Sequence, residues 1–323
     1  MSENRFQEAV SVVATPIRQS LFMIPVSLQE KIQEIRLRAG KPVVLVHNNQ
    51  MVFVTPQGEP MESPENNGMI CSYECLEQTF RAVCGYSVHT HQREMARGYI
   101  PLKGGHRVGI AATMVERDGQ ITSVKEISSL NIRVARELKG VSDLVPSYAL
   151  EGGLLLAGPP GCGKTTLLRD LARVISNQGN KVVILDERGE LAAMWDGIPQ
   201  NDVGVHTDVL NGFSKSAGME IALRSLSPQY IVCDEIGSQQ EAKGLMGCLY
   251  AGVQTIATVH AGNAEELYQK AWVMELLQGG AFEHVGLLRN ENGKRQITMI
   301  KTKEWFNEMD RNFLGGNHVF SAE

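Results

Sequence analysis

Residues 154–169 read Leu-Leu-Leu-Ala-Gly-Pro-Pro-Gly-Cys-Gly-Lys-Thr-Thr-Leu-Leu-Arg, an apolar run followed by a glycine-rich turn and a helical pattern. The turn fits G-x-x-x-x-G-K-[ST] at every fixed position with Gly158, Pro159, Pro160, Gly161, Cys162, Gly163, Lys164 and Thr165. Glycines let successive backbone N–H groups curve around phosphates at the start of a helix. An accidental glycine-rich turn is the alternative, but the preceding strand and the following helix favour a phosphate-binding loop.

Each polar side chain of this loop has an expected task. Lys164 brings a positive charge to the β- and γ-phosphates, and the Thr165 hydroxyl is a ligand for Mg²⁺. Thr166 adds a second hydroxyl near the α-phosphate. The stretch therefore predicts a site for ATP with Mg²⁺.

The chain around this loop alternates between short apolar strands and helical patterns. Strands are expected at residues 153–157, 181–185, 230–233 and 254–259, and helices at 165–176, 216–226, 239–250 and 264–277. A terminal hairpin is expected at 285–288 and 296–300. Apolar strands that alternate with helices indicate an α/β fold with a parallel central sheet, buried on both faces.

The first part of the chain has a different pattern, which predicts a smaller α+β domain. Strands are expected at residues 34–39, 42–47, 51–55, 105–115 and 125–135, with helices at 73–83 and 87–96 between them. This order indicates one mixed sheet covered on a face. The predicted organisation is an N-terminal domain at 1–140, a linker at 141–151, an ATPase domain at 152–304 and an unassigned tail at 305–323.

Composition narrows the function classes. The 323 residues carry a formal net charge of −5, so no global basic field attracts nucleic acid or anionic lipid. We expect no secretory signal in the first residues and no transmembrane segment, because the longest weakly polar stretch, 245–260, is broken by Gly247 and Gly252. Six cysteines without a Cys-x-x-Cys pair suit reduced thiols in the cytoplasm.

Two carboxylates follow the strand at 230–233. The carboxyl ends of parallel strands lie at the edge of the sheet where ligands bind, so Asp234 and Glu235 are expected beside the phosphates. Asp234 would hold Mg²⁺ through its water shell, and Glu235 would orient or deprotonate the attacking water. The alternative is that the pair only caps the next helix.

A second acidic cluster follows the strand at 181–185. Either Asp186 or Glu187 could position water or metal, and the sequence does not rank them; a solvated loop is the alternative. His260 ends the strand at 254–259 and could sense the γ-phosphate or contact Glu235, although a strand-end histidine is more often structural. Arg224 could pair with phosphate in its own or a neighbouring subunit, or only form a surface salt bridge.

Together these segments resemble the type II/type IV secretion and pilus ATPase superfamily, in which they are called Walker A, Asp box, Walker B and His box. The resemblance rests on residues 158–165, 186–190, 227–235 and 258–264, with Arg224. The segments 34–42, 104–109 and 128–135, with 207–210 and Gly218-Met219, are similar to the stage III sporulation protein AA family. Two positions depart from the pattern of that family. An arginine is expected where His206 stands, and a cysteine-proline pair where Phe213-Ser214 stands.

The resemblance implies a RecA-like P-loop core and a specific role. It implies an ATPase of a channel complex between mother cell and forespore in endospore formation, acting as a homo-oligomeric ring, expected to be a hexamer. The ring would lie in the cytoplasm on the mother-cell side, peripheral to a membrane complex whose proteins are its partners. The family also implies that Arg107 or Arg133 reaches nucleotide as the ring closes; the alternative is an ordinary strand-edge arginine.

Two other functions remain open at this point. A nucleic-acid-stimulated ATPase would use the same nucleotide core, but it would need a basic stripe with interleaved aromatics, which the sequence lacks, so no nucleic-acid partner is expected. The other is a nucleotide-gated scaffold that binds ATP and turns little over.

Overall fold

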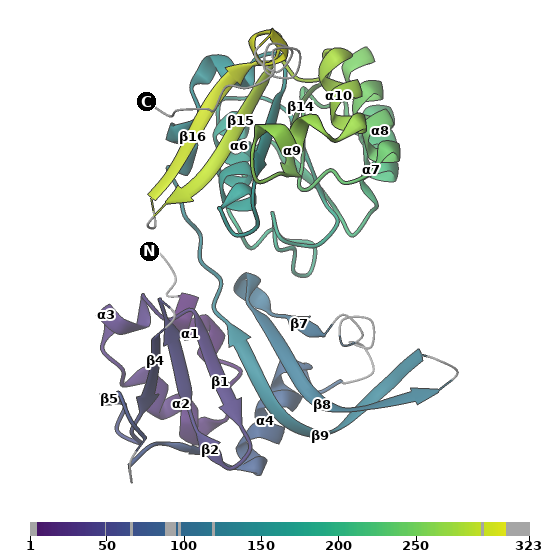
Figure 1. Cartoon of the computed structure of the whole chain (residues 1–323). Coiled ribbons are helices and arrows are strands. Elements are labelled where there is room, and N and C mark those ends of the chain that lie inside the picture. The colour runs from purple at the N-terminus through teal and green to yellow at the C-terminus, as the bar shows by residue number, and fades with distance from the viewer. Residues whose placement is uncertain are drawn as a thin grey trace. The chain divides into compact units, whose positions relative to one another are not determined.

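The computed structural model describes residues 5–48, 50–64, 67–87, 95, 98–117, 120–291 and 294–307 (Figure 1). The chain divides into two compact units. Unit 1 comprises Met1–Arg136 with Trp195–Gln200, and unit 2 comprises Glu137–Met194 with Asn201–Glu323. Most of the helix expected at 87–96 lies outside the described residues.

Unit 1 is built on a seven-stranded sheet in the order β5-β4-β3-β1-β9-β8-β7. Its strands are β1 (Glu34–Arg38), β3 (Val44–His47), β4 (Gln50–Val54), β5 (Pro60–Met61), β7 (Tyr99–Pro101), β8 (Arg107–Arg117) and β9 (Gln120–Arg133). Every pairing described within this sheet is antiparallel, so the prediction of a mixed sheet is wrong. The reason is local, because the tight connections within β3–β4 and β8–β9 can only join antiparallel neighbours.

Helices cover the apolar side of this sheet. They are α1 (Arg5–Val10), α2 (Thr15–Phe22), α3 (Val26–Gln29) and α4 (Tyr73–Val83), and a short ribbon pairs β2 (Lys41–Pro42) with β6 (Ile70–Cys71). Buried residues of α1, α2 and α4 share one core with strand residues such as Ile35 and Ile132. Only α4 was expected from the sequence; α1 to α3 are short and carry weak periodicity.

Unit 2 has the parallel sheet that the sequence predicts, in the order β12-β11-β13-β14-β10-β15-β16. Its strands are β10 (Leu154–Gly158), β11 (Val182–Asp186), β12 (Thr207–Asn211), β13 (Tyr230–Cys233), β14 (Gln254–His260), β15 (His284–Glu291) and β16 (Lys294–Lys301). The pairings from β12 to β15 are parallel, and only β16 is antiparallel to its neighbour. Strand β12 was not expected, because its burial is only partial.

The helices of unit 2 include α6 (Lys164–Asn177), α7 (Lys215–Ile221), α8 (Gln239–Tyr250), α9 (Ala264–Tyr268) and α10 (Ala271–Gln278). Alternate residues of the strands belong to two different cores. Leu154 and Leu156 pack with α6, whereas Leu155 and Ala157 pack in the core that contains residues of α7, α8 and α10. This alternation explains why the strands are apolar throughout, since both faces of the sheet are covered.

Two predicted helices are interrupted. The helix expected at 264–277 is divided into α9 and α10, because Lys270 adopts an extended backbone between them. The helix expected at 216–226 continues from α7 into a π-helical turn at Ala222–Leu226.

The expected linker and the expected tail also contain ordered residues. Short 3₁₀ turns occupy Val141–Leu144 and Ser147–Leu150, within the expected linker. Trp305, at the start of the expected tail, is fully buried in the core of unit 2.

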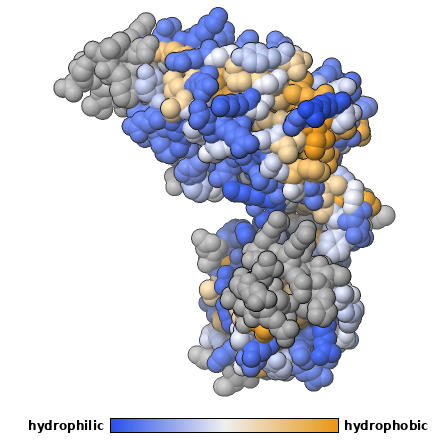
Figure 2. All heavy atoms as spheres, turned by 90° about the vertical axis from the view of Figure 1, so that its right-hand side faces the viewer, coloured by the Kyte–Doolittle hydropathy of each residue, from blue (hydrophilic) through white to orange (hydrophobic). Residues whose placement is uncertain are grey.

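The surface is mixed in character. In the view of Figure 2, hydrophilic side chains cover much of unit 2, and hydrophobic ones gather in one area of it. Within the described part of the chain, no helix is both long and apolar enough to span a membrane.

Candidate nucleotide site

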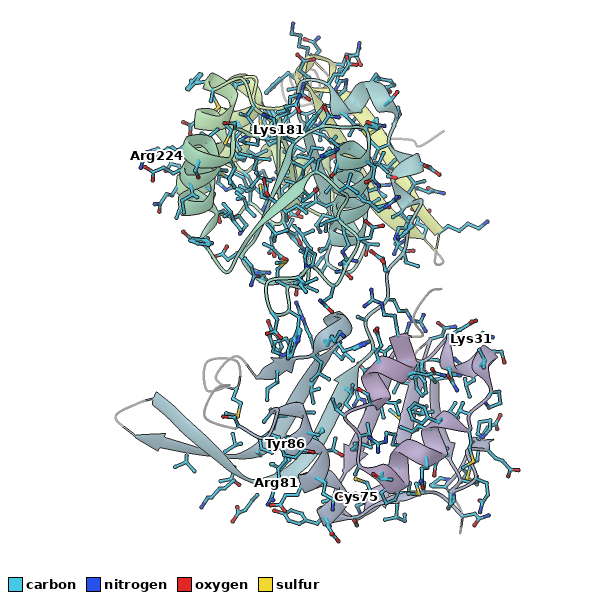
Figure 3. All side chains as sticks on the ribbon, turned by 180° about the vertical axis from the view of Figure 1, so that it is seen from behind. Lys31, Cys75, Arg81, Tyr86, Lys181 and Arg224 are labelled. Carbon is cyan, nitrogen blue, oxygen red and sulfur yellow. The ribbon has the colours of Figure 1, made fainter. Side chains whose placement is uncertain are left out.

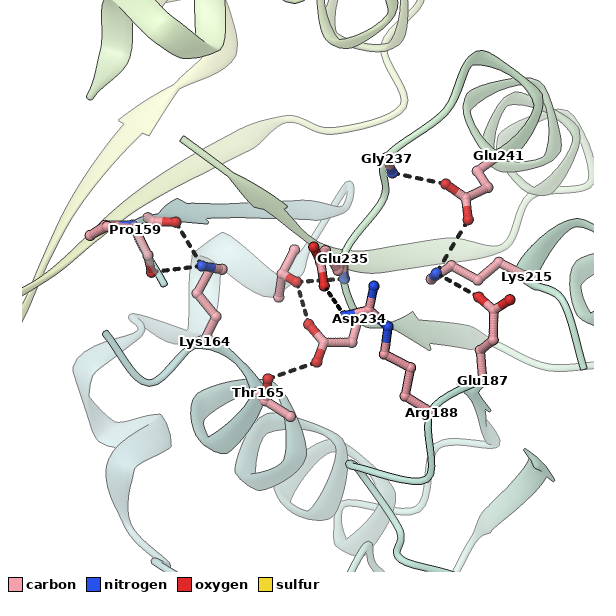
Figure 4. Close-up of polar contacts among 12 residues, drawn as sticks. Pro159, Lys164, Thr165, Glu187, Arg188, Lys215, Asp234, Glu235, Gly237 and Glu241 are labelled. Atoms are coloured by element: carbon pink, nitrogen blue, oxygen red, sulfur yellow. Dashed lines mark hydrogen bonds and ion pairs between the residues drawn. The ribbon is translucent and has the colours of Figure 1, made fainter. Parts of the chain in front are cut away.

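The glycine-rich loop connects β10 to α6, where the sequence places it. Gly161 and Gly163 have φ angles of 73° and 102°, in the left-handed region that glycine adopts without strain. The Lys164 ammonium donates to the carbonyl oxygens of Gly158, at 2.6 Å, and Pro159, at 2.9 Å (Figure 4). The loop therefore brings its lysine and the first amides of a long helix to one point.

A pocket of about 440 Å³ opens at this loop. That size is typical of small-molecule sites. The loop contributes Pro160, Gly161, Gly163, Lys164, Thr165 and Thr166, and other elements contribute Glu190, Asp234, Glu235, His260 and Arg295. The order of the strands explains this gathering, because β13, β14 and β10 are adjacent and parallel and end at the same edge.

Asp234 is directly connected to the loop. One carboxylate oxygen accepts a hydrogen bond from the Thr165 hydroxyl at 2.7 Å, and the other accepts one from the Thr258 hydroxyl at 2.5 Å. Thr258 is fully buried in β14 and also accepts the backbone N–H of Glu235 at 2.7 Å. A threonine hydroxyl and an aspartate are therefore paired at the start of α6, both with oxygen atoms of the kind that Mg²⁺ prefers.

Glu235 has an unusual backbone for a residue with a side chain, since its φ is 48°. Such conformations are sparsely populated and cluster at functional sites. Its carboxylate accepts a hydrogen bond from the Arg188 guanidinium at 2.5 Å, and both side chains are substantially exposed. Glu235 thus lies at the rim of the pocket, with a carboxylate held by an exchangeable surface contact.

The following helix does not use these acids as its cap. Its N-cap is Ser238, whose side chain accepts the Glu241 N–H while the Glu241 carboxylate accepts the Ser238 N–H. This reciprocal capping box satisfies the end of α8. The alternative interpretation of Asp234 and Glu235 as helix caps is therefore not what the structure shows.

Asp186 is buried, and its carboxylate is bound by backbone N–H groups. It is 2% exposed, and its carboxylate accepts the backbone N–H groups of Glu190, Leu191 and Ala192 at 2.8, 3.1 and 2.8 Å. Both oxygens are thus engaged in fixing the loop that follows β11. Of the two acids that the sequence left unranked, Asp186 is the one whose oxygens are already used by the backbone.

Glu187 belongs to a charged triad with Lys215 and Glu241. The Lys215 ammonium lies 2.8 Å from Glu187 and 3.2 Å from Glu241, and the lysine is 6% exposed (Figure 4). Burial by itself lowers the pKa of Lys215, but the two carboxylates outweigh it and raise that pKa above its ordinary value. The triad connects the loop after β11, the start of α7 and the start of α8.

His260 lines the pocket, and its side chain is 45% exposed. Its Nδ1 lies 3.9 Å from a carboxylate oxygen of Glu266, and that residue's other oxygen accepts the Gly262 N–H at 2.6 Å. The geometry leaves His260 accessible to a ligand in the pocket.

Of the three arginines named from the sequence, Arg224 belongs to unit 2, and Arg107 and Arg133 belong to unit 1. Arg224 projects from the outer surface of unit 2 and pairs with Glu220 one helical turn away (Figure 3). Arg107 and Arg133 face each other in register on β8 and β9 of unit 1, and the Arg107 guanidinium lies 4.9 Å from the centre of the Tyr99 ring. Arg224 does not line the pocket of unit 2.

Four residues of this region were given no role from the sequence, and one of them, Arg295, lies on β16. Thr258 begins the segment 258–264 that carries part of the resemblance and stands two positions before His260 on the same strand, but no role was predicted for it. Lys215 could not be placed because β12, which leads to it, was not predicted. Arg188 lies within the predicted acidic cluster, but no pattern indicated that it would contact Glu235.

Comparison with known proteins decides the family. The family model described as "Sporulation stage III, protein AA" matches residues 3–305. The chain belongs to this family. A member from Bacillus subtilis, stage III sporulation protein AA, is 32% identical over 306 residues, which cover 92% of this chain and 95% of that protein.

Solved structures show the same fold. The pilus retraction motor PilT with bound ADP aligns with a TM-score of 0.54 at 15% identity, covering 86% of this chain and 85% of that one. The ATPase DotB of Yersinia pseudotuberculosis aligns with a TM-score of 0.56 at 14% identity, covering 88% and 81%. The prediction of an α/β, RecA-like core with a parallel central sheet is confirmed.

Proposed function

We propose that this family member is a Mg²⁺-dependent ATPase. The observation that carries the proposal is the bond between the Thr165 hydroxyl and Asp234 at the end of the glycine-rich loop. One pocket thus contains two sets of groups. The loop amides and Lys164 are suited to bind phosphate, and the oxygen atoms of Thr165 and Asp234 are suited to bind a divalent cation. Thr166, one residue further along α6, adds its hydroxyl at the same pocket.

The donor set fits a nucleotide-bound metal. Within the described residues, no three His, Cys, Asp or Glu side chains come together as a metal site on their own. Mg²⁺ needs no such cage, because it keeps several waters and is held by one or two protein oxygens with substrate phosphates. Thr165 and Asp234 would hold it, and its chemistry would be to neutralise charge on the β- and γ-phosphates.

The protein's own groups have distinct tasks in this proposal. The Lys164 ammonium, which now donates to two carbonyl oxygens of its own loop, transfers its hydrogen bonds to the β- and γ-phosphates. Glu235 leaves Arg188 and accepts a hydrogen bond from the attacking water. His260 contacts the terminal phosphate from the end of β14.

Glu187 is proposed as the second carboxylate that positions water or metal, whereas Asp186 is proposed to support the loop that follows β11. We assign Arg224, Arg107 and Arg133 no contact with nucleotide in their own subunit. Arg107 or Arg133 is proposed to act on the nucleotide of a neighbouring subunit.

At the level of the cell, we propose a motor or assembly ATPase of a secretion-like channel complex in endospore formation. Membership of the stage III sporulation protein AA family and the fold shared with PilT and DotB support it. The protein would act as a homo-oligomeric ring, expected to be hexameric, in the mother-cell cytoplasm at the membrane. Its partners would be membrane proteins of the complex, and no nucleic acid is expected.

The test is phosphate release by the purified chain with ATP and Mg²⁺. Turnover that disappears in Lys164→Ala supports the proposal, and Lys243→Ala, on the exposed surface of α8, is the control. Tight ATP binding without turnover, alone or with membrane partners, would instead indicate a nucleotide-gated scaffold. Stimulation by single-stranded DNA or RNA would indicate a nucleic-acid-linked ATPase.

The pathway needs its own test. A sporulating strain carrying Lys164→Ala is expected to stop during endospore formation while producing the protein at a normal level. Affinity purification of the wild type from sporulating cells is expected to recover integral membrane proteins. Normal spores from the Lys164→Ala strain would contradict the role in endospore formation.

A further inference from the structure

An arginine of the C-terminal hairpin lies in the same pocket as the glycine-rich loop. Arg295 belongs to β16, where it pairs in register with Asn290 of β15. Its guanidinium group lies against Gly163, so that a Cβ on this glycine would be 2.5 Å from the arginine Nε and 3.2 Å from Cζ. Only a residue without a side chain allows this approach, and Gly163 is also the residue that precedes Lys164 at the start of α6.

The hairpin holds this arginine in place. Strand β15 pairs in parallel with β10, the strand that leads into the loop, and β16 pairs with β15 along its whole length. Arg295 is therefore carried by the same sheet as the loop, and its position does not depend on a separate mobile segment. The planar fork of a guanidinium is pre-organised, so little freedom is lost for each hydrogen bond that it forms.

The Nε–H of Arg295 is buried but has no hydrogen-bond partner among the described residues. Leaving a buried donor of a charged group without an acceptor is costly, and native structures rarely do so. Arginine donors match phosphate oxygens in geometry and charge, and they bind them by parallel hydrogen bonds. The pocket into which this side chain is directed is the one lined by the loop.

We propose that Arg295 is a nucleotide-binding residue, which donates from the same subunit to the α- and β-phosphates of a nucleoside di- or triphosphate. The proposal deepens the ATPase function above and rests on it. The α- and β-phosphates are assigned because loop amides such as that of Gly163 cradle them. Asp234, Glu235 and His260 lie instead at the strand ends, where the terminal phosphate is expected.

The experiment is a titration of ADP and of a non-hydrolysable ATP analogue, each with Mg²⁺, into the full chain and its variants, followed by calorimetry. Arg295→Gln removes the charge, Arg295→Lys keeps the charge without the planar fork, and Arg289→Gln is the matched control. Arg289 lies on the other strand of the same hairpin, is exposed, and does not line the pocket.

For Arg295→Gln we expect the Kd of both nucleotides to rise by the same factor, about 10- to 100-fold, the range for a lost hydrogen bond to a charged group. Arg295→Lys should lie between this variant and the wild type, and Arg289→Gln should bind as the wild type does. An unchanged Kd for Arg295→Gln, or a loss confined to the triphosphate, would overturn the assignment. Thermal unfolding verifies that each variant is folded, and if Arg295→Gln is not, the Arg295→Lys comparison decides.

Failure of this inference is distinct from failure of the ATPase function. A wild type that binds and hydrolyses ATP while Arg295→Gln binds equally well contradicts only the role of Arg295. A wild type that binds neither nucleotide, with Lys164→Ala indistinguishable from it, contradicts both.

Discussion

Strands β11 and β13 lie side by side, and each leads into an aspartate followed by a glutamate: β11 ends in Asp186, and Asp234 comes directly after β13. Leu185 of β11 is in register with Cys233 of β13, so Asp186 and Asp234 stand at the same level of the sheet. Their environments nevertheless differ. Asp186 accepts three backbone N–H groups, whereas Asp234 accepts two side-chain hydroxyls.

The difference arises from the residues that follow each pair. After Glu187 the chain turns at Gly189, whose φ is 66°, and brings the amides of residues 190–192 onto Asp186. After Glu235 the chain continues to α8, and the hydrogen bonds that the Asp234 carboxylate accepts among the described residues come from α6 and β14. A hydroxyl can rotate and exchange partners, but a backbone amide cannot. One strand end is thus suited to support a loop, and the other to bind a ligand.

The largest expected effect concerns the two glutamates. Glu235→Gln should reduce the ATP turnover number by about 10²- to 10⁴-fold, the range for loss of a general base, while ATP affinity remains near that of the wild type. Steady-state phosphate release and nucleotide titration measure the two quantities. The same substitution at Glu187 should reduce turnover less, and equal losses would show that both strand ends share the chemistry.

The two aspartates should separate stability from activity. Asp186→Asn should lower the free energy of unfolding by about 3 kcal/mol, because an amide NH₂ group would face backbone donors in a buried site. Asp234→Asn should cost less stability, because a threonine hydroxyl can accept from the new NH₂ group, but it should abolish Mg²⁺-dependent turnover. Urea denaturation and phosphate release test the pair. If Asp234→Asn proves more destabilising than Asp186→Asn, the assignment of a supporting role to Asp186 and a binding role to Asp234 is wrong.

Lys215, the buried lysine beside Glu187, tests whether the residues after β11 contribute to stability. Lys215→Met should lower the free energy of unfolding at pH 7 by about 2 kcal/mol, since it leaves two carboxylates without their partner. Lys215→Arg should restore part of this stability. Lys243→Met, at an exposed position of α8, should leave it unchanged.

The effect of Lys215→Met should depend on pH in a defined direction. Burial raises the pKa of Glu241, but the Gly237 N–H and Lys215 outweigh it, so the net pKa lies below the ordinary 4.5. A lowered carboxylate pKa contributes stability above pH 4.5 that is lost as the pH falls through the folded value. The raised pKa of Lys215 keeps its contribution up to an ordinary value of 10.5. The difference in the free energy of unfolding between Lys215→Met and the wild type should therefore shrink below pH 4.5. A difference that stays constant in urea titrations down to pH 3 would contradict a stabilising ion pair between Lys215 and Glu241.

The smallest effect is expected at the surface pair of Arg188 and Glu235. Arg188→Ala should change the free energy of unfolding by less than about 1 kcal/mol, because solvent screens exposed pairs. Arg224→Ala, which removes another exposed pair, is the matched control. A loss well above that of the control would show that Arg188 fixes the backbone of Glu235, a task that the structure gives to Thr258.

The sequence predicts those features that depend on local pattern. The spacing of residues 158–165, with a strand before it and a helix after it, identifies the loop, and alternating apolar segments identify the parallel sheet. Asp186 could not be separated from Glu187 because the deciding amides lie four to six residues further on, in a turn without regular structure. Arg295 and Lys215 could not be foreseen because their neighbours at the site, Gly163 and Glu187, are far away in the sequence.

Thr258 has a consequence for how the site could change state. One hydroxyl donates to Asp234 and accepts from the amide of Glu235, and the same strand ends two residues later in His260. A displacement of β14 along its own axis would therefore carry the cation ligand, the proposed base and the histidine together. The two hydrogen bonds of one threonine hydroxyl thus couple the position of the Asp234 carboxylate to that of the Glu235 backbone.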